Sequence, residues 1–202
     1  MMISNEQIIQ ILKNEAVPAL GCTEPVACAY ACAKCTEILG ATPDTISVEV
    51  SGNILKNGMG VGIPGTGMTG LPIAAALGAV CGKTEYGLEV LKDVLLGDNL
   101  QRAKQMLADD AVHIALFADA PDCLYAKATC TLKDDVVVVV IQQSHVNIVR
   151  IIKNDDVLYE KEVTKKEESV SVHSELTIRR IWDFIHEVDV KDIDFVLKGA
   201  EM

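Results

Sequence analysis

The sequence lacks the basic charge and the targeting segments on which several classes of protein depend. Its 202 residues include 18 Lys or Arg against 29 Asp or Glu, for a formal net charge of −11, which disfavours nucleic-acid backbones and anionic membranes as partners. No basic stretch followed by an apolar block marks a signal peptide, and no apolar run reaches membrane-spanning length. We therefore expect a cytoplasmic protein that binds neither nucleic acid nor membranes.

Several common catalytic and binding motifs are missing as well. The four histidines form no pair with ligand spacing, which disfavours zinc, and no G-x-S-x-G pattern supports a serine hydrolase. Gly62–Thr69 nearly matches a P-loop, but Met68 replaces the lysine that meets the phosphates. Two G-x-G-x-x-G matches within Gly60–Gly70 begin well after the end of the preceding predicted strand and lie outside any βαβ pattern. Nucleotide binding is therefore not expected.

The seven cysteines do not predict a disulfide framework, because their number is odd and no signal peptide precedes them. Free cysteine packs as a small hydrophobe, so most of them should be reduced and buried. Cys28, Cys32 and Cys35 have the C-x3-C-x2-C spacing of radical enzymes that bind an iron–sulfur cluster and S-adenosylmethionine. Their segment has helical spacing, and Lys34 stands where those enzymes carry an aromatic. We interpret the three as buried helix cysteines; a redox-sensing role is the other interpretation.

Hydrophobic periodicity predicts helices first, then antiparallel strands, then helices again, around a core that is aliphatic because only 4% of residues are aromatic. This order predicts an α+β fold with helices packed on one face of a mainly antiparallel sheet. Along the chain it gives a helical region over residues 1–110, a β-rich region over residues 111–165 and C-terminal helices over residues 170–202. Gly52–Gly70 is expected to be a glycine-rich loop, and Lys165–Ser169 a solvated run of charge. The predicted helices are Asn5–Val17, Glu24–Leu39, Leu71–Val80, Glu85–Leu96, Asn99–Ala108, Glu175–Val188 and a last one from Val190; the predicted strands are Ile46–Val50, Val112–Phe117, Tyr125–Leu132, Val136–Gln142, Val146–Ile152 and Val157–Val163.

Cys22 has the most unusual surroundings in the chain. Gly21 frees the backbone just before the sulfur, and Thr23 or Glu24 can cap the helix that follows. A thiol at the positive end of a helix is expected to ionise more readily. The nearby glycine stretch Gly62–Gly70 predicts a cradle of backbone N–H groups for a small anion such as a carboxylate. The two segments together predict a site built from loops that open helices.

Four further polar residues are candidates for the same site. Asn53, Lys56 and Asn57 precede the glycine stretch and can fix an amino-acid substrate, with Lys56 as carboxylate partner or base. The alternative for these three is an ordinary polar loop. His145, at the start of a predicted strand, is the best placed of the histidines for proton transfer, because an apolar sheet can tune its pKa. A structural role is the alternative for His145.

Four segments resemble the L-cysteine desulfidase family, which is related to the α chain of iron–sulfur L-serine dehydratases. They are Pro18–Pro25 (PALGCTEP), Ser51–Asn57 (SGNILKN), Gly62–Gly67 (GIPGTG) and Ser144–Val149 (SHVNIV). The resemblance runs through the whole chain, including the final helices. Family members, however, continue into a C-terminal half that is absent here. The resemblance implies that residues 1–202 are the N-terminal domain of a longer enzyme, either as a fragment or as a naturally split subunit.

The family members are lyases that carry a [4Fe–4S] cluster. They perform β-elimination on L-cysteine, or on L-serine in the relatives, giving pyruvate and ammonia, with sulfide from cysteine. The resemblance implies that Cys22 is one cluster ligand and that the other three lie in the missing half, since Cys81, Cys123 and Cys130 do not match them. This chain alone is therefore expected neither to hold the cluster nor to turn over, and its expected partner is that C-terminal half.

The remaining roles follow from combining the resemblance with the residues themselves. Lys56 and His145 are the candidates for the catalytic base. A homo-oligomer is compatible with the sequence, and cysteine or serine remains open as the substrate. The alternative function is a non-catalytic module that binds a small carboxylate or a partner chain through the glycine stretch. The expected substrate-binding residues are Thr23, Asn53, Asn57, Gly65, Thr66 and Gly67.

Overall fold

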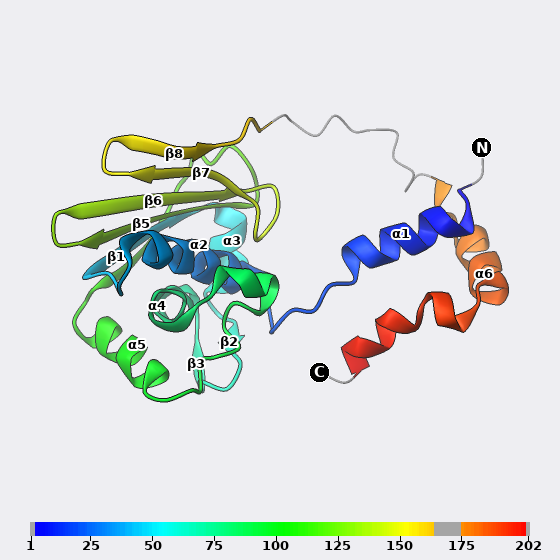
Figure 1. Ribbon diagram of the computed structural model, residues 1–202, viewed down its shortest axis with the longest axis horizontal. Coiled ribbons are helices and arrows are strands. Elements are labelled where there is room, and N and C mark those ends of the chain that lie inside the picture. Colours follow the sequence, from blue (N-terminus) through cyan, green and yellow to red (C-terminus); the bar gives the residue numbers. More distant parts are fainter. Residues whose placement is uncertain (1–2, 164–174, 201–202) are drawn as a thin grey trace. The chain divides into compact units, whose positions relative to one another are not determined.

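The structure of the chain is a computed structural model that describes residues 3–163 and 175–200 (Figure 1). The chain divides into two compact units. The large unit comprises residues 19–163, and the small unit joins residues 1–18 to residues 164–202. The predicted charge run Lys165–Ser169 lies outside the described residues. Within the described residues, no helix is both long enough and apolar enough to cross a bilayer.

The large unit is built on a six-stranded sheet in the order β4-β1-β5-β6-β7-β8. Strands β1 and β4 pair in parallel, and all other neighbours are antiparallel. Tight turns join β5 to β6 and β7 to β8, where Lys133 and Asn154 adopt the positive φ that such turns require. The strands are β1 (Thr45–Val50), β4 (Val112–Leu116), β5 (Tyr125–Leu132), β6 (Asp135–Gln142), β7 (Ile148–Lys153) and β8 (Asp156–Glu160).

The helices of the large unit cover one face of this sheet, as predicted (Figure 1). Helix α2 (Thr23–Leu39) packs on β5 and β6, helix α4 (Leu71–Cys81) packs on α2, and helix α5 (Asn99–Ala108) packs on α4. The alternation of the strands supplies the other side of the core, because every second residue points toward the helices. These fully buried residues are small or aliphatic: Ala126, Ala128, Cys130, Val137, Val139 and Ile141.

Helices α2 and α4 approach each other closely because both carry small residues at the crossing. A Cβ atom added to Gly78 would lie 2.5 Å from the Cα of Ala29 and closer still to its carbonyl oxygen. One added to Gly82 would lie 2.8 Å from the Cβ of Ala33. Small side chains at the crossing therefore allow this close packing.

Two predicted elements of the large unit are wrong. Gly52–Gly70 is not a continuous loop, because it contains helix α3 (Gly52–Gly58) and a hairpin of β2 (Gly62–Ile63) and β3 (Met68–Thr69). The buried hydroxyl of Ser51 caps α3 by accepting a 3.4 Å hydrogen bond from the Ile54 amide. The predicted helix Glu85–Leu96 is instead a short 3-10 helix, η1 (Thr84–Glu89), followed by turns. Gly87, with φ of 55°, breaks any continuous α-helix there.

The small unit contains helices α1 (Asn5–Glu15) and α6 (Ile178–Glu187), followed by the 3-10 helices η3 (Val190–Asp192) and η4 (Asp194–Ala200). Ser4 caps α1, since its side chain accepts a hydrogen bond from the Gln7 amide in a capping box. The last predicted helix is wrong in type, because the chain from Val190 on forms short 3-10 turns. In the part of this unit that the structure describes, the buried core is small: Ile3, Ile8 and Phe184.

Candidate functional site

The turn before α2 places Cys22 at the N-terminus of that helix and against the glycine stretch. Cys22 itself is the N-cap residue, in place of the expected Thr23 or Glu24, and its side chain makes no capping hydrogen bond. Gly21 has φ of +83°, and a Cβ atom added there would lie 3.1 Å from Pro64. The Cys22 thiol is partly exposed rather than sealed in the core. The two segments that the sequence singled out are therefore neighbours in the fold.

A carboxylate links the Cys22 turn to α3. The Cys22 Sγ atom donates a hydrogen bond to the Glu24 Oε2 atom at 2.8 Å. The other oxygen of Glu24 accepts from the Asn57 Nδ2 atom at 3.1 Å. Since Asn57 stands near the C-terminal end of α3, Glu24 fixes that helix beside the N-terminus of α2. The structure thus brings Cys22 and Asn57 together through a residue that sequence reasoning treated only as a helix cap.

The Glu24 carboxylate shapes the ionisation of the thiol. Burial raises the pKa of Cys22, and the hydrogen bond to Glu24 raises it further. The backbone N–H groups of Glu24 and Thr23 act in the opposite direction but do not prevail. The pKa of Glu24 is lowered, chiefly by the hydrogen bond from Cys22, with additional help from Asn57 and from the charge of His145. The expected thiolate at the helix N-terminus is therefore not favoured here, because a negative carboxylate is its neighbour.

His145 lies in the turn between β6 and β7, not at the start of a strand as expected. Asn147 holds this turn by donating from its Nδ2 atom to the Gln142 carbonyl at 2.8 Å. Burial lowers the pKa of His145, while the negative charge of Glu24 partly offsets this. The imidazole is accordingly neutral near pH 7 and able to accept a proton.

The other predicted residues of α3 are less engaged. Asn53, Lys56 and Asn57 are all exposed, and their i, i+3, i+4 spacing places them on one side of the helix. Within the described residues of the chain, neither Asn53 nor Lys56 makes a hydrogen bond or ion pair. The structure thus connects Asn57 to Cys22 and leaves the other two open to solvent. Thr23, the first residue of α2, is partly buried.

The glycine stretch forms a tight hairpin that uses much of its own hydrogen-bonding capacity. Thr66 is buried, and its hydroxyl donates to the Ile63 carbonyl at 2.7 Å and accepts from the Met68 amide at 3.0 Å. Thr66 therefore shapes the hairpin, and its hydroxyl is not available to a substrate. Gly65 and Gly67 have φ of +77° and +66°, and their amides are the ones that remain to meet a ligand.

A cavity of about 200 Å³ adjoins Gly65. One wall belongs to the segment after η1, whose Lys92 ammonium lies 3.3 Å from the centre of the Tyr86 ring. Its lining is otherwise mostly aliphatic: Leu20, Pro64, Leu91, Val94 and Leu95. Sequence reasoning missed this wall because it assigned the segment to a regular helix.

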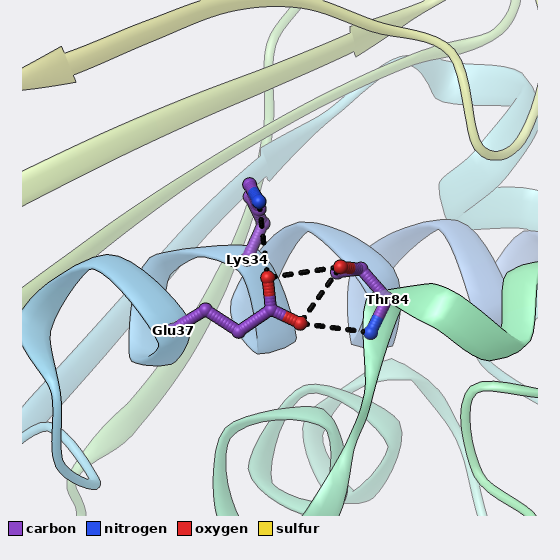
Figure 2. Close-up of polar contacts among 3 residues, drawn as sticks. All are labelled: Lys34, Glu37 and Thr84. Carbon is purple, nitrogen blue, oxygen red and sulfur yellow. Dashed lines mark hydrogen bonds and ion pairs between the residues drawn. The ribbon is translucent and has the colours of Figure 1, made fainter.

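Glu37 of α2 binds Thr84, the residue that begins η1 and so leads into the segment that lines the cavity (Figure 2). The Glu37 Oε1 atom accepts from the Thr84 amide at 2.9 Å and from the Thr84 hydroxyl at 2.7 Å. Lys34 donates to the Glu37 Oε2 atom at 3.0 Å. These bonds hold the residues that begin η1, and through them the segment that lines the cavity, at a fixed place on α2.

The other helix cysteines do not contribute to this site. Cys28, Cys32 and Cys35 are fully buried free thiols, as predicted for α2, and Cys130 of β5 is buried against them. Hydrogen bonding within this buried cluster lowers the pKa of Cys130 and raises the pKa of Cys32 and of Cys35. Among the described residues, no group of three or more His, Cys, Asp or Glu side chains is placed to hold a metal ion. Any metal bound through Cys22 needs ligands from elsewhere.

Comparison with known proteins finds relatives that are longer than this chain. A UPF0597 protein of Bacteroides fragilis is 44% identical over 197 residues, covering 98% of this chain and 46% of the relative. UPF0597 proteins of Bacteroides thetaiotaomicron and Dichelobacter nodosus are each 42% identical, covering 100% and 98% of this chain and 47% and 46% of their own lengths. No family model and no solved structure matches the chain. The chain is thus homologous to UPF0597 proteins along nearly all of its length, and it spans about half the length of the curated relatives it matches.

Proposed function

We propose that this chain is the N-terminal half of an iron–sulfur-dependent lyase that eliminates sulfide from L-cysteine, giving pyruvate, ammonia and sulfide. The observation that supports this most is the arrangement around Cys22. A partly exposed thiol at a helix N-terminus contacts a carboxylate, follows Gly21, which lies against Pro64 of the glycine hairpin, and has a neutral histidine within electrostatic reach of that carboxylate. The half-length match to the UPF0597 relatives supports the existence of a second half.

The residues present fit one point of attachment for a cluster. Cys22 can supply one thiolate, whereas the buried cysteines of α2 and β5 are closed off in the core. The remaining ligands would come from the second half. When bound, a [4Fe–4S] cluster with one iron free of protein sulfur supplies a Lewis acid for the leaving group.

The chain's own residues would handle the protons. Glu24 is placed to receive the proton that the Cys22 thiol must lose before it can bind a metal. Asn57 keeps the carboxylate turned toward the sulfur. His145, neutral and partly buried, is the better candidate for the base that removes the α-proton of the substrate, and Lys56 is the other. The amides of Gly65 and Gly67 are candidates for binding the substrate carboxylate.

The elimination balances without a redox partner. Removal of the α-proton and departure of sulfide from the β-carbon of L-cysteine leave 2-aminoacrylate. Its imine tautomer takes up one water and releases ammonia and pyruvate. L-Serine would react in the same way with water as the leaving group. The contacts that distinguish the two substrates fall partly in the half that this chain does not contain.

The test is anaerobic reconstitution of this chain with a polypeptide spanning the remaining half of the Bacteroides fragilis relative. Iron, acid-labile sulfide and pyruvate formation are measured. We expect a cluster only in the mixture, and we expect the Cys22→Ala variant to lose bound iron and activity. Cys123→Ala, at an exposed cysteine in the segment between β4 and β5, is the matched control and should retain both. Full iron content and activity in Cys22→Ala would exclude Cys22 as a ligand.

The cavity beside Gly65 supports a second candidate function, a module that binds a small carboxylate without catalysis. Lys92 provides a cation at its wall, and the volume of about 200 Å³ suits a ligand of amino-acid size. Calorimetric titration of this chain alone with L-cysteine and L-serine separates the two ideas. Tight binding that is lost in Lys92→Gln, with no cluster formed in any mixture, would favour the module.

A further inference from the structure

Helix α6 of the small unit presents an apolar stripe to solvent. Ile178 is 89% exposed, Ile181 46%, Trp182 58% and Ile185 56%. Their i, i+3, i+4, i+7 spacing aligns them along one side of the helix. Phe184 lies at one edge of the same apolar face and is buried with Ile3 and Ile8. Among the described residues, the small unit thus covers only one edge of this face.

Because the small unit is so small, an apolar stripe left exposed to water lowers its stability by a large fraction. Among its described residues, the buried core consists of three side chains, and a unit of this size gains little stability from a core so small. Four large apolar side chains in a row on a ten-residue helix are more than the scattered single exposures normal for protein surfaces. This pattern is typical of a helix that docks into a groove of another chain.

We propose that the α6 stripe is the surface on which the second half of the protein docks, that is, the polypeptide corresponding to the portion of the UPF0597 relatives that this chain does not span. The relatives are about twice as long as this chain, so the portion that this chain does not span is a polypeptide of similar size. A second copy of this chain is a poorer occupant, because two chains of net charge −11 repel each other. The inference shares with the proposed function the existence of a second half, but it does not depend on the lyase chemistry.

The chain carries its own probe of this surface, because Trp182 is its single tryptophan. The probe polypeptide is the remaining half of the Bacteroides fragilis relative with its tryptophans replaced by phenylalanine. In this chain alone, we expect Trp182 to show the red-shifted emission of a solvated indole and to be quenched readily by acrylamide. Addition of the probe polypeptide should shift the emission to shorter wavelength and protect it from quenching.

Two variants make the test specific. Ile185→Asp, on the stripe, should weaken binding at least about tenfold, as expected for a charge placed in the centre of an apolar interface. Leu158→Asp, at a 54% exposed position on β8 of the large unit, is the control and should bind like the unchanged chain. Circular dichroism of both variants confirms that they fold.

The other outcomes overturn the proposal. They are no binding of the probe polypeptide at tens of micromolar, binding that leaves Trp182 accessible, or equal binding by Ile185→Asp. Shielding of Trp182 without the probe polypeptide would also overturn it, and shielding that increases with concentration would assign the stripe to self-association. If the probe polypeptide docks but no cluster forms, the proposed lyase function is contradicted and the docking surface stands. If a cluster forms but Trp182 is not protected, the docking surface is contradicted and the lyase function stands.

Discussion

Cys22 and Glu24 form a donor–acceptor pair in which each side chain controls the protonation of the other. The thiol holds its proton because burial disfavours its charged form and because the carboxylate accepts a hydrogen bond from it, and the same hydrogen bond helps to keep the carboxylate ionised. A thiol in this state is a poor nucleophile, since the thiolate is the reactive form. The pair therefore keeps an accessible cysteine protonated and unreactive until a group that binds the sulfur more strongly, such as a metal ion, displaces the proton.

Removal of the Glu24 charge should release this restraint. In Glu24→Gln we expect the pKa of Cys22 to fall and its alkylation by iodoacetamide near pH 7 to become faster. In the unchanged chain the rate should increase with pH, because the raised pKa keeps the thiol protonated at neutral pH. Rates are followed for each cysteine-containing peptide by mass spectrometry.

Cys123, which is exposed and distant in sequence, serves as the internal reference and should react at the same rate in both proteins. The buried Cys28, Cys32 and Cys35 should stay unmodified in the native state. A slower or unchanged Cys22 in Glu24→Gln would show that burial alone, without the carboxylate, sets the reactivity of this thiol.

At this scale the sequence predicts which residue to examine but not its partners. The glycine before Cys22 and the helix after it are local features, so the turn could be anticipated from a few neighbouring residues. The contact between Glu24 and Asn57 joins positions 33 residues apart. The electrostatic interaction between Glu24 and His145 joins positions separated by most of the sequence of the large unit. Neither is encoded in a local pattern, because both arise only when α2, α3 and the β6–β7 turn pack together.

At the scale of elements, the strands were easier to predict than the short helices. Residues 111–163 contain short runs rich in β-branched and apolar residues with turn residues between them, and each predicted strand there is present, with its ends within three residues of the predicted ones. Helix α3 escaped prediction because seven residues, two of them glycines, carry too little periodicity. The segment that contains η1 gave the opposite error, because its apolar residues have helical spacing and predicted a continuous helix. Gly87 breaks that helix, and the chain forms successive turns instead.

The crossing of α2 and α4 offers a direct test of how tightly this layer is packed. In Gly78→Ala the added methyl group would meet the backbone of Ala29, which cannot move aside as a flexible side chain can. We expect a net loss of about 1–3 kcal/mol in the free energy of unfolding, although alanine is the better helix former by about 1 kcal/mol. Urea denaturation followed by far-UV circular dichroism measures it.

Gly60→Ala is the matched control, because a Cβ atom there meets nothing within 4 Å and the residue does not have a positive φ. Its free energy of unfolding should change by no more than about 0.5 kcal/mol. If Gly78→Ala proves as stable as the unchanged chain, then α2 and α4 can separate at little cost and the close crossing is not a main source of stability.

At the scale of the whole molecule, the α+β architecture followed from the order of elements, but the grouping into compact units did not follow chain order. Residues 1–18 belong with the C-terminal helices, because Ile3 and Ile8 are buried with Phe184. Periodicity shows which face of a helix is apolar but not which distant helix covers it. The main core, by contrast, draws all its fully buried members from between Val26 and Ile151.

This division predicts that the large unit folds without the small one. A fragment of residues 19–163 should keep the thermal midpoint of the full chain within about 2–4 °C, the shift that a change of 1 kcal/mol gives in a domain of this size. In the full chain, Trp182 fluorescence reports on the small unit through the loss of its ring contact with His186, 4.5 Å away between centroids, whereas far-UV circular dichroism reports mainly on the large sheet and its helices. Because the small core is so limited, the fluorescence transition should come at lower urea than the dichroism transition. Coincident transitions, together with an unfolded 19–163 fragment, would show that the two units fold as one cooperative body.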